Sequence, residues 1–137
     1  MRKLLTPLLV LALATPALAQ AAPELAIELN ALAASETGCR VTFLATNRLG
    51  TELTRSALEI ALFGADGGID RLVSLEFKAM PEGKARVLQF DLSGLACESI
   101  SRVLINDVVA CEGEGLDPKT CLTALKPTSR LAAGFGV

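Results

Sequence analysis

The residues with the greatest capacity for chemistry form an acidic stretch near the end of the chain. Asp107, Glu112, Glu114 and Asp117 lie within eleven residues, and the glycines beside Glu114 allow tight curvature. Carboxylates at such spacing can gather around Ca²⁺, which takes about six to eight oxygen ligands. The ordered D-x-D-x-D-G pattern of a calcium loop is missing, so we expect a solvated acidic loop and no metal site.

Hydrolytic chemistry has little support, because the chain contains no His, Trp or Tyr. A serine nucleophile would lack a histidine base, no G-x-S-x-G occurs, and the lysines for a Ser–Lys pair sit in turn-like or exposed segments. Glu112 and Glu114 could serve glycoside hydrolysis, but a chain without Trp or Tyr offers poor sugar subsites. We predict no enzyme and no cofactor, and keep a small hydrolase only as an alternative.

Asn106 and Asp107 interrupt an apolar run and form a second candidate polar site. A buried carboxylate needs partners, and Arg102 or Arg40 could supply one. A recognition or acid–base role is one reading. A strand-ending turn or a satisfied ion pair is the interpretation that we favour.

Four cysteines, Cys39, Cys97, Cys111 and Cys121, follow the N-terminal segment. An even number in an exported chain indicates two disulfides, and four cysteines allow three pairings. We favour Cys39–Cys97 with Cys111–Cys121, since the second pair closes the acidic loop locally and leaves the first to join distant strands. A metal site of four thiolates is the rival reading, but its usual C-x-x-C pairs are missing.

Residues 1–19 have the pattern of a secretory signal peptide. Arg2 and Lys3 form a positive region, Leu4 to Ala14 is apolar, and Ala17-Leu18-Ala19 fits the small-x-small cleavage rule. The apolar run is shorter than the roughly 20 residues of a membrane-spanning helix. We therefore expect a periplasmic or secreted protein, without a membrane span after cleavage, whose single domain occupies residues 20–137.

The charge of the expected mature chain excludes one class of partner. Removing Arg2 and Lys3 leaves 11 of the 13 basic residues against 15 acidic ones, which gives a net charge of −4. The basic residues are scattered along the chain. Such a surface predicts no nucleic-acid binding.

The element that organises the chain is a predicted hairpin over residues 57–77. Leu58, Ile60 and Leu62 alternate with other residues as in a half-buried strand, and Ala65-Asp66-Gly67-Gly68 suits a tight turn. Ile69 to Phe77 forms the return strand. A hairpin exposes an apolar face that it cannot bury alone, so a second layer must come from the flanking segments.

The remaining elements supply that layer. Further strands are expected over 24–33, 39–46, 87–92 and 100–110, with a closing strand over 129–135. Asp117 can cap a short helix that has Pro118 at its first position, runs to Lys126 and stops at Pro127. The sequence thus predicts an all-β immunoglobulin-like sandwich of about seven strands with one short C-terminal helix.

Three apolar residues fall on strand faces opposite the expected core: Leu44, Phe63 and Leu72. One such residue is ordinary, but three on adjacent strands would form a patch that binds a partner. A sheet bulge, or cover by the terminal helix, is the alternative explanation and the one that we favour.

The middle of the chain, residues 39–92, resembles the FxLYD-type immunoglobulin-like modules of secreted bacterial proteins. The resemblance is carried by an N-x-x-G variant at Asn47–Gly50, by the strand ending in Leu62-Phe63, and by Pro81–Gly83 leading to Phe90. The Pro-Gly turn has an inserted residue and the motif's Tyr is missing. The resemblance implies a sandwich and no catalytic residues.

The whole chain, including Arg102–Asp107 and Cys111-Glu112, is also similar to small periplasmic proteins of bacteria. We expect a non-enzymatic binding module with a protein partner, which acts through an exposed sheet face or an edge strand. The candidate contact residues are Leu44, Phe63, Leu72, Glu112 and Glu114. An alternative is an inhibitor of an exported enzyme that presents loop 111–121 to a basic target.

Overall fold

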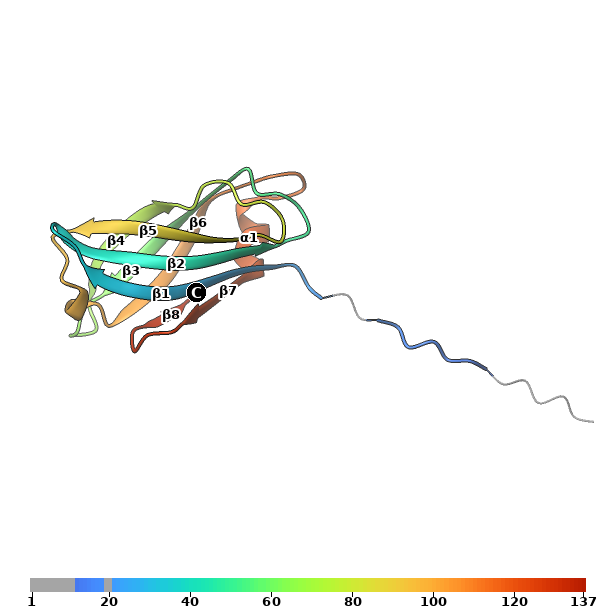
Figure 1. The fold of residues 1–137 in the computed structure, drawn as a ribbon, viewed down its shortest axis with the longest axis horizontal. Helices are drawn as coiled ribbons and strands as arrows, with labels where there is room; N and C mark the ends of the chain where they lie inside the picture. The colour runs from blue at the N-terminus through green and yellow to red at the C-terminus, as the bar shows by residue number, and fades with distance from the viewer. Residues whose placement is uncertain (1–11, 19–20) are drawn as a thin grey trace, which may run out of the picture.

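Two four-stranded β-sheets make up most of the described chain (Figure 1). One sheet has the strand order β5–β2–β1–β7, and the other has the order β4–β3–β6–β8. The all-β prediction is confirmed, with eight strands in place of about seven. The strands are β1 (Glu24–Ala34), β2 (Gly38–Arg48), β3 (Arg55–Phe63), β4 (Ile69–Glu76), β5 (Ala85–Ser93), β6 (Arg102–Glu112), β7 (Leu125–Ser129) and β8 (Gly134–Gly136).

The structure is a computed structural model that describes residues 12–18 and 21–137. Residues 12–18 are exposed and have no regular secondary structure. The predicted signal peptide therefore lies largely outside the described residues. No helix in the described part of the chain is both long and apolar enough to cross a membrane.

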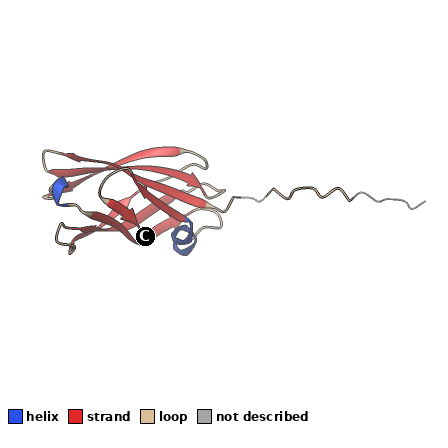
Figure 2. Cartoon of the chain, turned by 90° about the horizontal axis from the view of Figure 1, so that it is seen from below, coloured by secondary structure: helices blue, strands red, loops and turns tan. Residues whose placement is uncertain are grey.

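The predicted hairpin is present as β3 and β4, which pair in antiparallel fashion. Leu58, Ile60 and Leu62 are each 1% exposed, so the alternation reports one buried face as expected. The turn between the strands uses Gly67 at a φ of 83°, a backbone conformation that favours glycine. The two sheets lie one over the other as two layers (Figure 2), and the buried residues of the hairpin belong to the core cluster that both sheets share.

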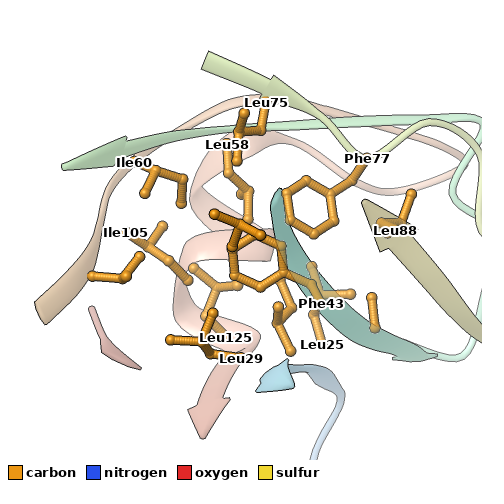
Figure 3. Packing of buried hydrophobic residues seen from close by; sticks show 14 of the residues in the cluster. Leu25, Leu29, Phe43, Leu58, Ile60, Leu75, Phe77, Leu88, Ile105 and Leu125 are labelled. Atoms are coloured by element: carbon orange, nitrogen blue, oxygen red, sulfur yellow. The ribbon is translucent and has the colours of Figure 1, made fainter. Parts of the chain in front are cut away.

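The core lies between the two sheets and is centred on Phe43 (Figure 3). The Phe43 ring centroid lies 5.4 Å from those of Phe77 and Phe135, and 6.1 Å from that of Phe90. Each fully buried Leu or Phe side chain stabilises the fold by about 1.5–3 kcal/mol relative to exposure. The sheet of β5, β2, β1 and β7 is thus the second layer that the hairpin required.

The C-terminal helix starts as predicted and ends earlier than predicted. Asp117 caps helix α1 (Pro118–Ala124), with Pro118 in its first turn. The chain then becomes strand β7, which runs parallel to β1 with Leu125 opposite Leu25. The expected helical end at Lys126 is wrong because burial of Leu125, which is 4% exposed, draws the chain into the sheet.

The single closing strand expected over 129–135 is replaced by two short strands. β7 ends at Ser129, and β8 crosses to the other sheet, where it pairs in parallel with β6. The crossing packs the Phe135 ring, which is partly buried, against the ring of Phe43. Pro127 is tolerated because β7 is an edge strand, which needs fewer backbone donors.

Both favoured disulfides are present. Cys39 at the start of β2 is bonded to Cys97 in the short 3₁₀ helix Cys97–Ser99, which precedes β6. Cys111 near the end of β6 is bonded to Cys121 in α1. The first bond ties β2 to the connection between β5 and β6, and the second fixes α1 near the end of β6.

Candidate interaction surface

The carboxylates of the acidic stretch do not gather at one site, and each has different neighbours. The Glu112 carboxylate lies 3.8 Å from the Arg55 guanidinium, which also lies 3.2 Å from the Glu76 carboxylate. Glu114 is exposed, while Asp117 caps α1. In the described part of the chain no group of three or more potential metal ligands comes together. The calcium reading therefore gains no support from the geometry.

The Asp117 carboxylate accepts a 2.7 Å hydrogen bond from the backbone N–H of Thr120 and a 2.8 Å bond from its hydroxyl. These bonds favour the charged carboxylate, so they lower the pKa of Asp117 below its ordinary value. The residue is a helix cap that is charged at neutral pH.

Asn106 and Asp107 lie at an irregularity of β6, where the register with β3 shifts. Asn106 is exposed and donates a 2.6 Å hydrogen bond to the Glu59 carboxylate. One Asp107 carboxylate oxygen accepts a bond from the Val108 N–H. The expected strand-ending turn is wrong, because β6 continues through this irregularity to Glu112, and neither arginine proposed as an ion-pair partner is paired with Asp107.

Those two arginines have other contacts. Arg102 lies with its guanidinium 4.0 Å above the centre of the Phe63 ring. Arg40 forms a 3.0 Å ion pair with Asp91, and this bond raises the pKa of the Arg40 guanidinium. The carboxylate of Asp107 therefore has no basic side chain bound to it among the described residues.

The three apolar candidates do not form one patch. Leu44 lies on β2 in the first sheet, whereas Phe63 and Leu72 lie on β3 and β4 in the second. A register shift between Leu62 and Phe63 matches the expected bulge. Alternation along a strand reveals which residues share a face, but it does not reveal to which sheet the strand belongs.

The second sheet presents a continuous outer surface, which we call the β3 face. It contains the outward residues of β3 between the buried ones, with their neighbours on β4 and β6. Ala61 is flanked by Leu72 on one side and by Leu104 on the other. Leu72 is 56% exposed, and Phe63 and Leu104 are partly exposed. The β3 face consists of Glu59, Ala61, Phe63, Leu72, Leu104 and Asp107.

The first sheet has a smaller outer apolar pair. Leu44 is partly exposed and lies opposite Val87 of β5, which is 65% exposed. Glu28 flanks Leu44 on β1. This pair provides a matched comparison for Leu72 on the β3 face.

The two long edge strands carry inward arginines that protect them from pairing. Arg71 of β4 lies opposite the inward Leu62 and donates a 2.8 Å hydrogen bond to the Ser93 carbonyl of β5. Arg86 of β5 donates to the Ala79 carbonyl. A strand that paired with either edge would bury a charged side chain, so these arginines discourage edge pairing.

The two remaining edges, β7 and β8, are short. β7 contains Lys126 and Pro127, and β8 has three residues. Shortness, proline and lysine are the usual protections of an exposed edge. The sheet faces are therefore better placed than the edges to receive a partner.

A groove of about 470 Å³ lies between α1 and the residues that precede β1. Its threonine hydroxyls already have partners, since that of Thr120 donates to the Asp117 carboxylate and that of Thr123 donates to the Lys119 carbonyl. Comparison with protein-family models, curated proteins and solved structures finds no match to this chain. The function must therefore be argued from the surface itself.

Two features of the structure were not singled out from the sequence. The first is the pair of hydrogen bonds that Arg71 and Arg86 donate to backbone carbonyls of other segments, which no local sequence pattern indicates. Glu59 has a weak signal, because a charged residue between Leu58 and Ile60 must face outward. The sequence does not reveal that Asp107 lies opposite it.

Proposed function

We propose that this protein is an exported, non-enzymatic binding module that recognises a protein partner through the β3 face. The observation that carries the proposal is the 56% exposure of Leu72 on a sheet surface where Ala61 separates it from Leu104 and where Phe63 and Leu104 are also partly exposed. Apolar side chains that are exposed on one sheet surface favour association, because docking removes them from water. The arginine-protected edges favour the face over strand addition as the mode of binding.

Export is part of the proposal. The two disulfides support it, because such bonds persist in oxidising compartments, and the signal-peptide pattern of residues 1–19 is consistent with them. We place the mature protein in the periplasm or outside the cell. Fractionation of the producing cells, with N-terminal sequencing of the recovered protein, tests this: a cytoplasmic protein that retains residues 1–19 would contradict it.

We also propose an immunoglobulin-like class for the sandwich. The grouping of β1, β2 and β5 against β3, β4, β6 and β8 supports the assignment, since that fold divides its strands in this way. Two features depart from the antiparallel pattern of that fold. A helix precedes β7, and two strand pairs are parallel, namely β7 with β1 and β8 with β6.

Capture with matched variants tests the proposed binding surface. Leu72→Asp introduces a charge into the β3 face, and Val87→Asp makes the same change at a 65% exposed position of the other sheet. A partner captured from a periplasmic extract should bind wild-type protein and the Val87→Asp variant equally well, and it should not bind the Leu72→Asp variant. Binding that survives Leu72→Asp, or that is lost only with Val87→Asp, would place recognition elsewhere.

Loop 111–121 offers a second candidate function, the inhibition of an exported enzyme. The loop is closed by a disulfide, and Gly113 packs so closely on the Glu52 carbonyl that a side chain would not fit. Exposed Glu114 follows this fixed point. If the loop inhibits, Glu112→Ala with Glu114→Ala should abolish inhibition while Leu72→Asp leaves it intact. No structural observation favours the small-hydrolase alternative.

A further inference from the structure

Two carboxylates occupy opposed positions on neighbouring strands of the β3 face, and neither forms an ion pair with a basic side chain of the described residues: Glu59 accepts a hydrogen bond from Asn106, and Asp107 accepts one from the Val108 N–H. Glu59 of β3 is the register partner of Asp107 of β6, so the residues lie directly opposite on neighbouring strands. Among the described residues, every ion pair involves other side chains. Like charges directly opposite in a sheet are destabilising. The arrangement therefore costs stability locally, as residues kept for recognition often do.

The carboxylates lie beside the exposed apolar residues. Ala61 is the next outward residue of β3 after Glu59, and it is flanked by Leu72 and Leu104. Ala61 itself is 2% exposed because the larger neighbours cover it. The result is an apolar centre with negative charge along one side, which is a common arrangement in protein interfaces.

The nearby arginine side chains do not neutralise the carboxylates of Glu59 and Asp107. Arg55 is shared between Glu76 and Glu112, and Arg102 lies over the Phe63 ring. Around β3 there are thus four carboxylates, from Glu59, Glu76, Asp107 and Glu112, against two guanidinium groups. The outer surface of these strands keeps a net charge of −2 by this count.

From this charge pattern we infer that the partner presents a basic protein surface, with Lys or Arg side chains beside an apolar contact. The inference rests on the proposed function, and it defines the chemistry of the partner. A basic side chain would pair with Glu59 and Asp107 and remove their mutual repulsion. A second copy of this chain is a poor occupant, because two β3 faces would bring four such carboxylates together.

Charge-neutral variants test the inference with a defined probe, immobilised poly-L-lysine. Glu59→Gln with Asp107→Asn removes both charges from the β3 face. Glu24→Gln with Glu28→Gln removes the same charge from β1 of the other sheet. We expect the first pair to weaken binding about tenfold at low salt, and the second to change it by less than about twofold. Equal losses for both pairs would show diffuse attraction and overturn the inference.

The captured partner provides a separate readout. Its binding should weaken with Glu59→Gln and Asp107→Asn and with rising salt, since exposed charges are screened. If binding of the partner requires Leu72 but changes neither with the two carboxylate substitutions nor with salt, this inference is wrong and the proposed function still holds. If capture is indifferent to Leu72, the proposed function itself fails. A wild-type dimer that Leu72→Asp dissociates would also refute a basic partner.

Discussion

The side-chain amide of Asn47 donates a 2.9 Å hydrogen bond to the carbonyl oxygen of Met80. The same amide donates to the Thr51 carbonyl, and the Asn47 side-chain oxygen accepts a bond from the Leu49 N–H. Asn47 is fully buried, so its polar groups have no access to water. One side chain thus holds two connections of the sandwich in place, which gives the Asn47–Gly50 motif a structural role.

Replacing this amide by a carboxylate should be costly. In Asn47→Asp the carboxylate would face two carbonyl oxygens to which the amide now donates, and we expect a loss of about 3 kcal/mol or more in unfolding free energy. Urea unfolding measures it. Gln89→Glu makes the same chemical change at an exposed residue of β5, whose amide donates one 3.2 Å hydrogen bond to the Thr42 hydroxyl. Because a hydroxyl can donate to a carboxylate instead, this change should cost less than about 1 kcal/mol. Similar losses at both positions would show that the Asn47 network does not stabilise the fold.

Local patterns predicted much of this fold. The hairpin of β3 and β4 follows from the alternation of Leu58, Ile60 and Leu62 and from a glycine turn, and both signals lie within a few residues. The cap at Asp117 is equally local, since its partner Thr120 lies three residues on. The disulfide pairing was predicted because the shorter pair closes a loop.

Distant pairings account for what the sequence did not reveal. Leu125 leaves the helix because it pairs with Leu25, which lies 100 residues earlier in the sequence. Leu44 was grouped with Phe63 and Leu72 because all three side chains point away from the core. The strand of Leu44, however, belongs to a different sheet from the strands of Phe63 and Leu72. The opposed carboxylates of Glu59 and Asp107 depend on the register of two strands far apart in sequence. Alternation contains no information on any of these relationships.

The two disulfides should contribute unequally to stability. Cys39 and Cys97 are separated by 58 residues, and Cys111 and Cys121 by 10. Because a longer closed loop restricts the unfolded chain more, the double alanine variants should lose about 4 and about 3 kcal/mol, respectively. Chemical unfolding of both variants measures the difference. A greater loss for the short loop would contradict the loop-entropy explanation and indicate that fixing α1 dominates.

Acid should remove the contribution of the Asp117 cap. The hydrogen bonds from Thr120 lower the pKa of Asp117 in the folded state, so the unfolded chain binds the proton more readily. The stabilisation is present above the unfolded pKa and is lost as the pH falls through the folded value. Asp117→Asn keeps a neutral cap, so its stability deficit relative to wild type should shrink in acid. Unfolding free energies of both proteins across the carboxyl titration range test this; a constant deficit would contradict it.

Removing the inward charge from β4 should make that edge adhesive. Arg71 bonds to the Ser93 carbonyl, and its charge must be desolvated by any strand that pairs with β4. Arg71→Val leaves an apolar edge beside the exposed Ile69 and Leu72, so we expect concentration-dependent association in sedimentation velocity. Arg48→Val is the control, because it removes an exposed arginine from β2, which is covered on both sides by β1 and β5. Equal association of both variants would show that the loss of a positive charge, and not the unprotected β4 edge, causes association. If neither variant associates, the β4 edge is protected by a feature other than Arg71.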